Sequence, residues 1–534
     1  MKRWAINIAS SYGRFVVAII AVFMLTPFII ERVGMEDYGL WALALAVSGM
    51  LGLMDFGLAT AAVKYVAEHT ARGDIEGRNR VISTLLTCYL SVGGVALVIV
   101  SIYAFGTYDA TSTDGITGRE DFRILCVMVG LMVALGFPLS LFRAALTGSG
   151  NMFLSNLAEI IMTLSYTSLS ALFLINGSGL AGLPIAQAIG MSMGLGMLVW
   201  LSYRKLDGLK LTLSFKGLRD SRDLLAFSGW AFVANAAVLL IMRMDPILIK
   251  AMMPLSAVAI YAVAAKIAEY ALLLNKQFSN ALMPMISQAH GAGSSNTVQQ
   301  VLTNGTRYLM ALAMPMLVLI AIYADPLLTL WLGAGFEDAV PVLQTLAVAV
   351  GCSVLQLNAA NVLGMTGKHR FVASAMGMSA TINLVITLIL LPRIGLLGAA
   401  IGSLSAALII ETGVILPSAC KHAGVSFGQF LVGVIARTLP PLLPMLGLTW
   451  VFLHYAPPES LLGLIGQCMI LGLLYLVGYF LVALSVTLAR VVLLAVIAFG
   501  LVATGVAAFA EFHAAPRSKP WELVFRQTGA PPFV

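Results

Sequence analysis

Four ionisable side chains interrupt two hydrophobic segments near the middle of the chain, at residues 227–284. Arg243 and Asp245 lie in the first segment, and Lys266 and Glu269 lie in the second. A Lys, Arg or Asp at the centre of a membrane helix costs roughly 2.5 to 3.5 kcal/mol. Such side chains therefore face a protein interior or a water-filled cavity in nearly all cases. Since the rise of about 1.5 Å per residue places Arg243 and Lys266 at similar depth, the pattern predicts a polar site inside the bilayer.

The spacing of these four residues indicates which side of its helix each side chain faces. Lys266, Glu269 and Tyr270 fall at positions i, i+3 and i+4, which share one face of a helix, so Lys266 and Glu269 could simply pair with each other. Arg243 and Asp245 are two residues apart and point to different sides of their helix. We therefore expect Arg243 to be the cavity residue of the first segment, with Asp245 meeting a neighbouring helix.

Other apolar segments also contain single charges. These are Arg14, Asp55, Glu159, Lys276, Glu411 and Arg437. The ten charges comprise five cations and five anions, and a set of structural ion pairs would show the same balance as a binding site. Arg14 lies deep in the first segment, although its side chain could reach the inner headgroups. Lys276 is nearer the end of its segment, so we expect it to extend towards the headgroups.

The composition excludes a soluble protein. Of 534 residues, 60% are hydrophobic and 10% are charged, and the longest hydrophilic interval, 204–224, is too short to bury a core. The five cysteines are scattered, and the histidines have no metal-ligand spacing, so the sequence predicts no metal site and no cofactor. Without a Gly-x-Ser-x-Gly motif or a phosphate-binding loop, neither a hydrolase nor an ATPase is supported.

Apolar runs long enough to cross a bilayer recur along the chain and predict an all-α polytopic membrane protein with about fourteen transmembrane helices. The runs are 7–30, 38–63, 81–105, 124–146, 153–175, 180–203, 227–251, 257–283, 305–323, 340–363, 371–391, 395–419, 430–455 and 461–484. A further run at 491–510 is either a fifteenth span or a helix lying against the bundle. The tail 511–534 is polar and is expected to be flexible.

Lys and Arg residues are concentrated in alternate loops, with eighteen on one side and five on the other. This bias places the N-terminus in the cytoplasm. It also explains the net charge of +7 without nucleic acid or another anionic partner, although the basic interval 204–222 is suited to contact with anionic lipids.

Two parts of the chain repeat each other. The segment 179–190, GLAGLPIAQAIG, matches 395–406, GLLGAAIGSLSA, and the turn at 27–41 matches that at 246–264. The repeat predicts two pseudo-symmetric six-helix lobes. The predicted organisation is an N-terminal lobe with a basic linker at 1–224, a second lobe at 225–424, additional membrane helices at 425–510 and a tail at 511–534.

Three motifs near the N-terminus resemble a known family. They are GMEDYGLW at 34–41, LMDFGL at 53–58 and KYVAE at 64–68. These stretches resemble the second-helix region of bacterial polysaccharide flippases, which move O-antigen and exopolysaccharide repeat units and belong to the multidrug/oligosaccharidyl-lipid/polysaccharide exporter superfamily. The resemblance implies two bundles around a central cavity that opens alternately to cytoplasm and periplasm in the bacterial inner membrane. It implies an undecaprenyl-pyrophosphate-linked oligosaccharide as substrate and no enzymatic activity.

This resemblance also suggests roles for the membrane-embedded charges. Arg14, Arg243 and Lys266 would bind the pyrophosphate, although only Arg14 follows, loosely, the pattern of basic residues in related lipid II flippases. The carboxylates are candidates for coupling to a H⁺ or Na⁺ gradient, or for ion pairs. They are Asp55, Asp245 and Glu269. Membrane lipids and glycan polymerases or assembly enzymes are the implied partners.

Two alternative functions stay open at this point. A cation-coupled multidrug exporter of the same superfamily would rely on carboxylates and aromatic residues rather than on a cationic cavity. A membrane glycan polymerase or ligase would need a sizeable outward loop with acid or base residues, and the largest outward interval, 106–123, is short.

Overall fold

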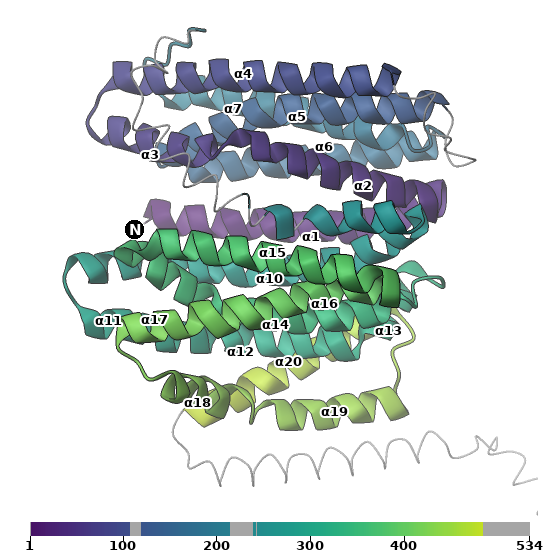
Figure 1. Cartoon of the computed structure of the whole chain (residues 1–534), viewed down its shortest axis with the longest axis vertical. Coiled ribbons are helices and arrows are strands. Elements are labelled where there is room, and N and C mark those ends of the chain that lie inside the picture. Colours follow the sequence, from purple (N-terminus) through teal and green to yellow (C-terminus); the bar gives the residue numbers. More distant parts are fainter. Residues whose placement is uncertain (1, 107–118, 214–235, 237–238, 242, 484–534) are drawn as a thin grey trace, which may run out of the picture. The chain divides into compact units, whose positions relative to one another are not determined.

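The computed structural model describes residues 2–106, 119–213, 236, 239–241 and 243–483, and every regular element in these ranges is a helix (Figure 1). Eleven of the described helices are long and apolar enough to cross a membrane, or twelve when one bent pair is taken as a single span. The predicted all-α polytopic membrane fold is therefore confirmed.

The predicted number of fourteen spans is somewhat higher, for two reasons. The continuous helical stretch Ala339–Ile394 covers two predicted spans, which are separated where Gly367 adopts a φ of 89°. The predicted span at 227–251 is described only in part, with residues 227–235, 237, 238 and 242 outside the described ranges, and the run at 491–510 lies entirely outside them.

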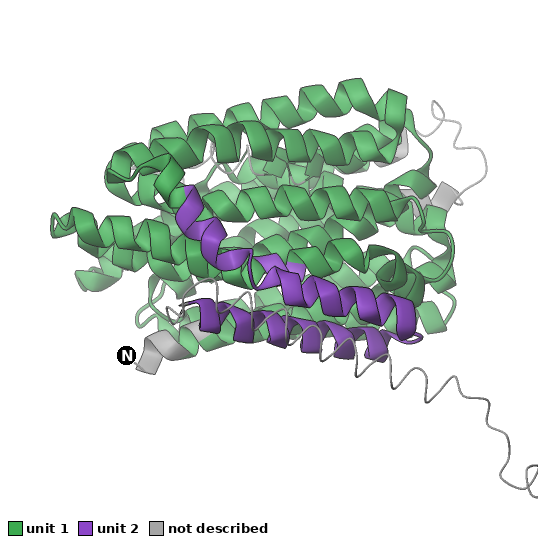
Figure 2. Cartoon of the chain, turned by 90° about the horizontal axis from the view of Figure 1, so that it is seen from below, with its two compact units in different colours: residues 1–313, 317–430 green, residues 314–316, 431–534 purple. Residues whose placement is uncertain are grey.

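The chain divides into two compact units (Figure 2). The first contains residues 1–313 and 317–430, and the second contains residues 314–316 and 431–534. Apart from residues 314–316, both predicted lobes belong to the first unit, and the domain boundaries proposed from the sequence remain predictions.

The first lobe consists of long helices that pack in pairs. They are α1 (Lys2–Val33), α2 (Met35–Leu51), η1 (Gly52–Asp55), α3 (Leu58–Ala71), α4 (Ile75–Gly106), α5 (Arg119–Gly148), α6 (Met152–Ile175) and α7 (Gly182–Lys205). Helix α4 packs on α5, α6 packs on α7, and α1 packs on α6. One apolar core of this lobe joins α3, α4, α5 and α7 around fully buried side chains such as Leu85 and Tyr89.

The second lobe has the same kind of construction. Its elements are α10 (Leu255–Gly291), α11 (Ser295–Gln300), η2 (Val301–Gly305), α12 (Thr306–Ile322), α13 (Ala324–Leu332), α14 (Ala339–Leu363), η3 (Gly364–Lys368), α15 (His369–Ile394), α16 (Leu396–Ala406), η4 (Ala407–Ile415) and α17 (Leu416–Ala423). Helix α10 packs on α14, and α15 packs on α16. Residues 243–252, which precede α10, are also helical.

The internal repeat is preserved in the backbone. Gly179 and Gly395, which open the two copies of the glycine motif, have φ values of 54° and 64°, in the left-handed region that glycine adopts at little cost. Three residues further on, Gly182 lies against the preceding helix at Phe173, and Gly398 lies against the preceding helix at Leu390. Since the same register places a close helix approach in both copies, the structure supports two pseudo-symmetric lobes.

The two lobes meet where α2 crosses α10. Gly39 lies directly against the backbone of Leu255, and a Cβ at Gly39 would overlap the Leu255 carbonyl oxygen. Nearby, Trp331 of α13 stacks on Phe23 of α1 and donates a hydrogen bond of 2.8 Å to the carbonyl of Phe23. These contacts join the lobes at the end of the molecule where α1 ends and α2 begins.

The second predicted span, 38–63, is broken in the structure. Phe56 and Gly57 both adopt left-handed backbone conformations, with φ values of 49° and 75°, so α2 and η1 end before α3 begins. The carboxylate of Asp55 accepts a hydrogen bond from the backbone N–H of Ala59 at 3.4 Å and another from the hydroxyl of Tyr89. Asp55 therefore satisfies the exposed backbone at the start of α3, which corrects the expectation of one continuous helix.

The helices of the second unit are α18 (Phe427–Thr438) from Leu431 onward, α19 (Leu442–Tyr455) and α20 (Leu461–Ala483). The first two form the bent pair, with an angle of 43° between them. Tyr475 of α20 is fully buried, and its hydroxyl donates to the carbonyl of Thr438 at 3.0 Å. This hydrogen bond satisfies the Thr438 carbonyl at the bend, because the backbone N–H of Leu442, four residues on, donates to Leu439 instead.

We expect the substitution Gly39→Ala to destabilise the protein by about 1 to 3 kcal/mol, because the added methyl group overpacks the crossing of α2 and α10. The measurement is the thermal unfolding midpoint of the detergent-solubilised protein. Gly377→Ala is the matched control, since a Cβ at this helical position of α15 meets nothing within 4 Å. The close approach would be irrelevant to stability if both variants unfolded at the temperature of the unsubstituted protein.

Candidate functional site

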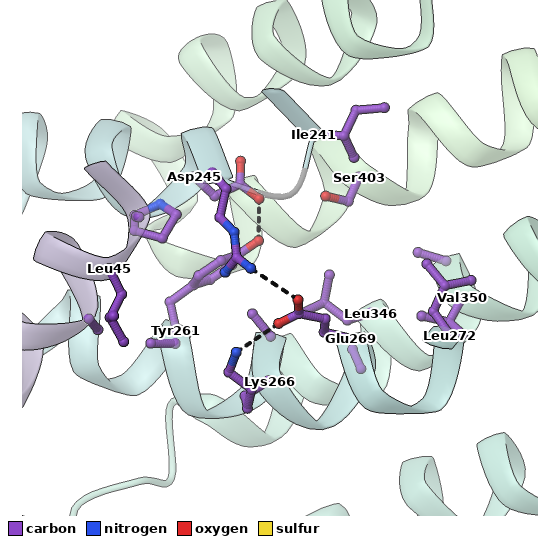
Figure 3. Close-up of a pocket in the computed structure, with 18 of the residues that line it drawn as sticks. Leu45, Ile241, Asp245, Tyr261, Lys266, Glu269, Leu272, Leu346, Val350 and Ser403 are labelled. Carbon is purple, nitrogen blue, oxygen red and sulfur yellow. Dashed lines mark hydrogen bonds and ion pairs between the residues drawn. The ribbon is translucent and has the colours of Figure 1, made fainter. Parts of the chain in front are cut away.

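A cavity of about 360 Å³ lies between the two lobes of the first unit (Figure 3). The wall formed by α1, α2 and α6 is apolar and aromatic, with Leu25, Tyr38, Trp41, Leu45 and Tyr166 among its residues. This wall offers hydrophobic surface with a few hydroxyl groups and, among the described residues, no charge.

The opposite wall carries the charges. All charged side chains that line the cavity in the described part of the chain come from the second lobe and the segment before it. They are Arg243, Asp245, Lys266, Glu269, Lys276 and Glu411. The cavity is therefore amphipathic across its width, with three cations and three carboxylates on one side and apolar surface on the other.

Glu269 of α10 holds two of these cations at once. Its carboxylate accepts from Arg243 at 3.2 Å and from Lys266 at 2.8 Å, the latter contact being visible in Figure 3. The three side chains are half-buried and together carry one net positive charge. The alkyl part of Arg243 also lies beside Gly49 of α2, where an added Cβ would stand 3.1 Å from Arg243 Cδ. Arg243 thus reaches from the second lobe to the first.

Asp245 lines the same cavity as Arg243, whereas we expected only Arg243 to face it. Asp245 is buried, and it accepts a hydrogen bond from the hydroxyl of Tyr261 rather than from a cation (Figure 3). Its second oxygen, Oδ1, has no hydrogen-bond partner among the described residues. Among the described residues, Arg243 and Lys266 therefore pair with Glu269 and not with Asp245.

Arg14 does not line this cavity. It forms an ion pair with Glu159 of α6, and the other oxygen of the same carboxylate accepts from Arg143 of α5 at 2.6 Å. Glu159 is buried, so it needs compensating charge, and the two arginines supply it. Asp55 is likewise absent from the lining, because it caps α3. The expectation that both lobes place charges in one shared cavity is therefore not met in this structure.

Sequence reasoning gave no site role to two charged residues that line the cavity. Lys276 was expected to extend towards the headgroups, but it lines the cavity and has no ion pair with a described residue. Glu411 is buried and receives a hydrogen bond of 3.4 Å from Gln356 of α14. Both charges were visible in the sequence, but which face of a helix looks into a cavity is decided by packing.

Two asparagines of α14 form hydrogen bonds to a neighbouring helix. Asn358 accepts a hydrogen bond of 2.7 Å from Ser279 of α10, and Asn361 donates one of 2.9 Å to the same hydroxyl. These contacts join α10 to α14 inside the second lobe. Among the described residues, no cluster of three or more His, Cys, Asp or Glu side chains is arranged to hold a metal ion.

Two family models match the sequence. The model described as "Polysaccharide biosynthesis protein" matches residues 1–290, and the model described as "MatE" matches residues 231–389. The first match covers more than half of the chain.

Curated relatives share a low level of identity over most of the chain. The "Putative O-antigen transporter" of Shigella flexneri is 20% identical over 379 residues, which are 70% of this chain and 88% of the relative. The "Probable low-salt glycan biosynthesis flippase Agl15" of Haloferax volcanii is 22% identical over 391 residues, which are 71% of this chain and 76% of the relative.

Solved structures share the fold. The chain is similar to the inward-closed lipid II flippase MurJ, with a TM-score of 0.60, 14% identity and coverage of 87% of this chain and 97% of that structure. It is also similar to an inward-facing multidrug resistance transporter of the MOP superfamily, with a TM-score of 0.62, 15% identity and coverage of 77% and 98%. The fold predicted from the resemblance is confirmed.

We expect Glu269→Gln to destabilise the protein by about 1.5 to 3 kcal/mol, because Arg243 and Lys266 would then repel each other without a shared carboxylate. The double variant Glu269→Gln with Lys266→Gln is expected to recover part of this loss, since it leaves one cation instead of two. Thermal unfolding of the single and double variants measures the coupling. If the two substitutions were additive, Glu269 would not link the cations energetically.

Proposed function

The chain belongs to the polysaccharide biosynthesis protein family, and we propose that it is a flippase that moves an undecaprenyl-pyrophosphate-linked oligosaccharide across the membrane by alternating access. The names of its relatives, an O-antigen transporter and a glycan biosynthesis flippase, support this substrate class. They also favour a transporter over an enzyme such as a glycan polymerase or ligase.

The amphipathic cavity is the observation that carries the proposal. A lipid-linked oligosaccharide has an anionic pyrophosphate, a polar sugar chain and a prenyl tail. Arg243, Lys266 and Lys276 offer three cations on one wall, and the opposite wall is apolar and aromatic. The pyrophosphate binds on the charged wall, where guanidinium and ammonium groups donate charge-assisted hydrogen bonds to phosphate oxygens.

Substrate binding requires an exchange of partners at Glu269. Arg243 and Lys266 are both occupied by this carboxylate in the structure, so a phosphate has to compete with it. The competition favours the phosphate because it carries more negative charge than the single carboxylate. Lys276, which has no ion pair with a described residue, is available without such an exchange.

We assign Arg14 a different role from Arg243. Its group with Glu159 and Arg143 carries one net positive charge in the first lobe, outside the cavity lining. In our proposal this second cationic group meets the pyrophosphate at another stage of the cycle, when the lobes are arranged differently.

We place the protein in the bacterial inner membrane with a cytoplasmic N-terminus, on the basis of the Lys and Arg bias of its loops. In that orientation, the crossing of α2 and α10 closes the periplasmic end. For release of the substrate outside, the lobes have to rock so that this contact opens. Membrane lipids surround the exposed apolar faces, and glycan polymerases or assembly enzymes are proposed partners.

Coupling to a H⁺ or Na⁺ gradient is a further part of the proposal, with Asp55, Asp245 and Glu269 as the carboxylates predicted from the sequence. Each has a partner in the structure: Asp55 binds Tyr89, Asp245 binds Tyr261, and Glu269 binds two cations. A coupling ion at any of them has to compete with these existing contacts.

The match of residues 231–389 to the second family model favours one alternative, a cation-coupled multidrug exporter. The three cations that line the cavity are matched by three carboxylates, so its net charge alone does not separate an anionic cargo from a cationic one. Drug sensitivity of a deletion strain, compared with its glycan export, separates the two functions.

We expect Arg243→Ala to reduce movement of a lipid-linked oligosaccharide about tenfold or more, since a charge-assisted contact contributes roughly 1.5 to 3 kcal/mol. Lys266→Ala is expected to have a similar effect, because either substitution leaves one cation beside Glu269, and Arg14→Ala a smaller one, because Arg14 lies outside the cavity lining. The measurement is glycan export in a flippase-deficient strain, together with transport in vesicles that contain the purified protein and a defined lipid-linked donor.

Arg393→Ala is the control for this series, because Arg393 is exposed in the last turn of α15. Membrane levels of all variants are compared by immunoblotting. If the three cavity and first-lobe variants exported glycan as well as the control did, anchoring of the pyrophosphate by these cations would be abandoned.

A further inference from the structure

Glu411 is a buried carboxylate for which neither the sequence pattern nor the comparisons give a role. It is 7% exposed, lines the cavity and lies in η4, a π-helical stretch between α16 and α17. π-Helical turns inside α-helices are rare and occur frequently at functional sites. No described Lys or Arg lies within ion-pair distance of Glu411, which distinguishes it from Glu159 and Glu269.

One side-chain amide and two hydroxyl groups lie around the carboxylate of Glu411. Gln356 of α14, 3% exposed, donates to the carboxylate through Nε2, while its carbonyl Oε1 has no hydrogen-bond partner among the described residues. The hydroxyls of Ser353 and Ser379, from α14 and α15, lie beside the same carboxylate. Because rotation of the amide exchanges its oxygen and nitrogen, Gln356 can present either atom to this space.

The ionisable groups near Glu411 do not neutralise it. From α14, the thiol of Cys352 is the titratable group near the carboxylate, and Ser379 faces it from α15. Of the cavity cations, Arg243 and Lys266 are held by Glu269, and Lys276 makes no ion pair with Glu411. Asp245 is bonded to Tyr261. An ionised carboxylate this deeply buried is costly without a counter-charge, so it has to bind a proton or another cation.

We propose that Glu411, Gln356, Ser353 and Ser379 form a binding site for one monovalent cation, either Na⁺ or H⁺. A carboxylate, an amide oxygen and hydroxyls are the hard oxygen ligands that suit an alkali cation, and the same carboxylate accepts a proton when no metal ion is bound. The inference deepens the proposed transport function by adding an ion site that is separate from the three carboxylates with existing partners. The binding itself does not depend on that function.

The test uses the purified full-length protein in detergent without substrate, so that a failure of glycan transport and a failure of this site are distinguishable. Thermal unfolding is followed in NaCl, KCl and choline chloride at one ionic strength, and between pH 5 and pH 8 in choline chloride. The unsubstituted protein is compared with Glu411→Gln and with Glu31→Gln, an exposed carboxylate in the last turn of α1.

A sodium site predicts that NaCl raises the midpoint by about 2 °C or more over choline chloride, since a bound ligand stabilises the folded state. A proton site predicts instead that the midpoint rises as the pH falls. Glu411→Gln is expected to remove whichever response occurs, and Glu31→Gln is expected to retain it. The proposal is overturned if the unsubstituted protein shows neither response, or if Glu411→Gln responds as the unsubstituted protein does.

A second measurement covers the case in which Glu411→Gln does not fold. Dicyclohexylcarbodiimide reacts with protonated carboxyl groups in apolar surroundings, and peptide mass spectrometry of the unsubstituted protein locates the adduct. Labelling of Glu411 that NaCl or a raised pH suppresses supports the site. An unlabelled Glu411, or labelling that neither condition changes, overturns it.

Discussion

A carboxylate shared between two cations is the interaction on which both lobes depend. Glu159 binds Arg14 and Arg143, and Glu269 binds Arg243 and Lys266. Removing a charge from water is costly, and an ion pair offsets this cost only when its geometry is good and its hydrogen bonds are satisfied. Each carboxylate places one oxygen on each cation, so neither oxygen is left unpaired. The arrangement also leaves one positive charge in excess in each lobe, which a single ion pair would not do.

Duplication preserved the backbone register of the lobes but not their chemistry. Gly182 and Gly398 each lie close to the preceding helix, at Phe173 and Leu390, whereas Glu159 lies on α6 and Glu269 lies on α10, which are not equivalent helices. Backbone packing at a glycine tolerates no side chain, while an ion pair can be formed from any helices that face each other. As a result, the charged wall of the cavity belongs to the second lobe, and the first lobe contributes apolar surface.

The difference between a repeated backbone register and ion pairs between distant helices also decides what the sequence could predict. The fold was predictable because apolar length and a repeated glycine motif each leave a direct pattern, and the contact of Lys266 with Glu269 was predictable because helical spacing places both on one face. The contact of Glu269 with Arg243 and that of Glu159 with Arg14 join distant segments, which no local pattern encodes. The break at Phe56 was missed because apolarity continues across it, although Gly57 marks the position.

A shared carboxylate also suits a site that must bind and release an anion in turn. If Arg243 and Lys266 were unpaired, their repulsion would favour very tight binding of a phosphate, and release would be slow. If each had its own carboxylate, a phosphate would have to displace two ion pairs. With Glu269 held between them, an incoming anion displaces one group, and the same carboxylate pairs with both cations again when the anion leaves. The cost of burying charge is then similar with and without ligand, so neither state is trapped, and the difference in free energy that drives transport has to come from elsewhere in the cycle.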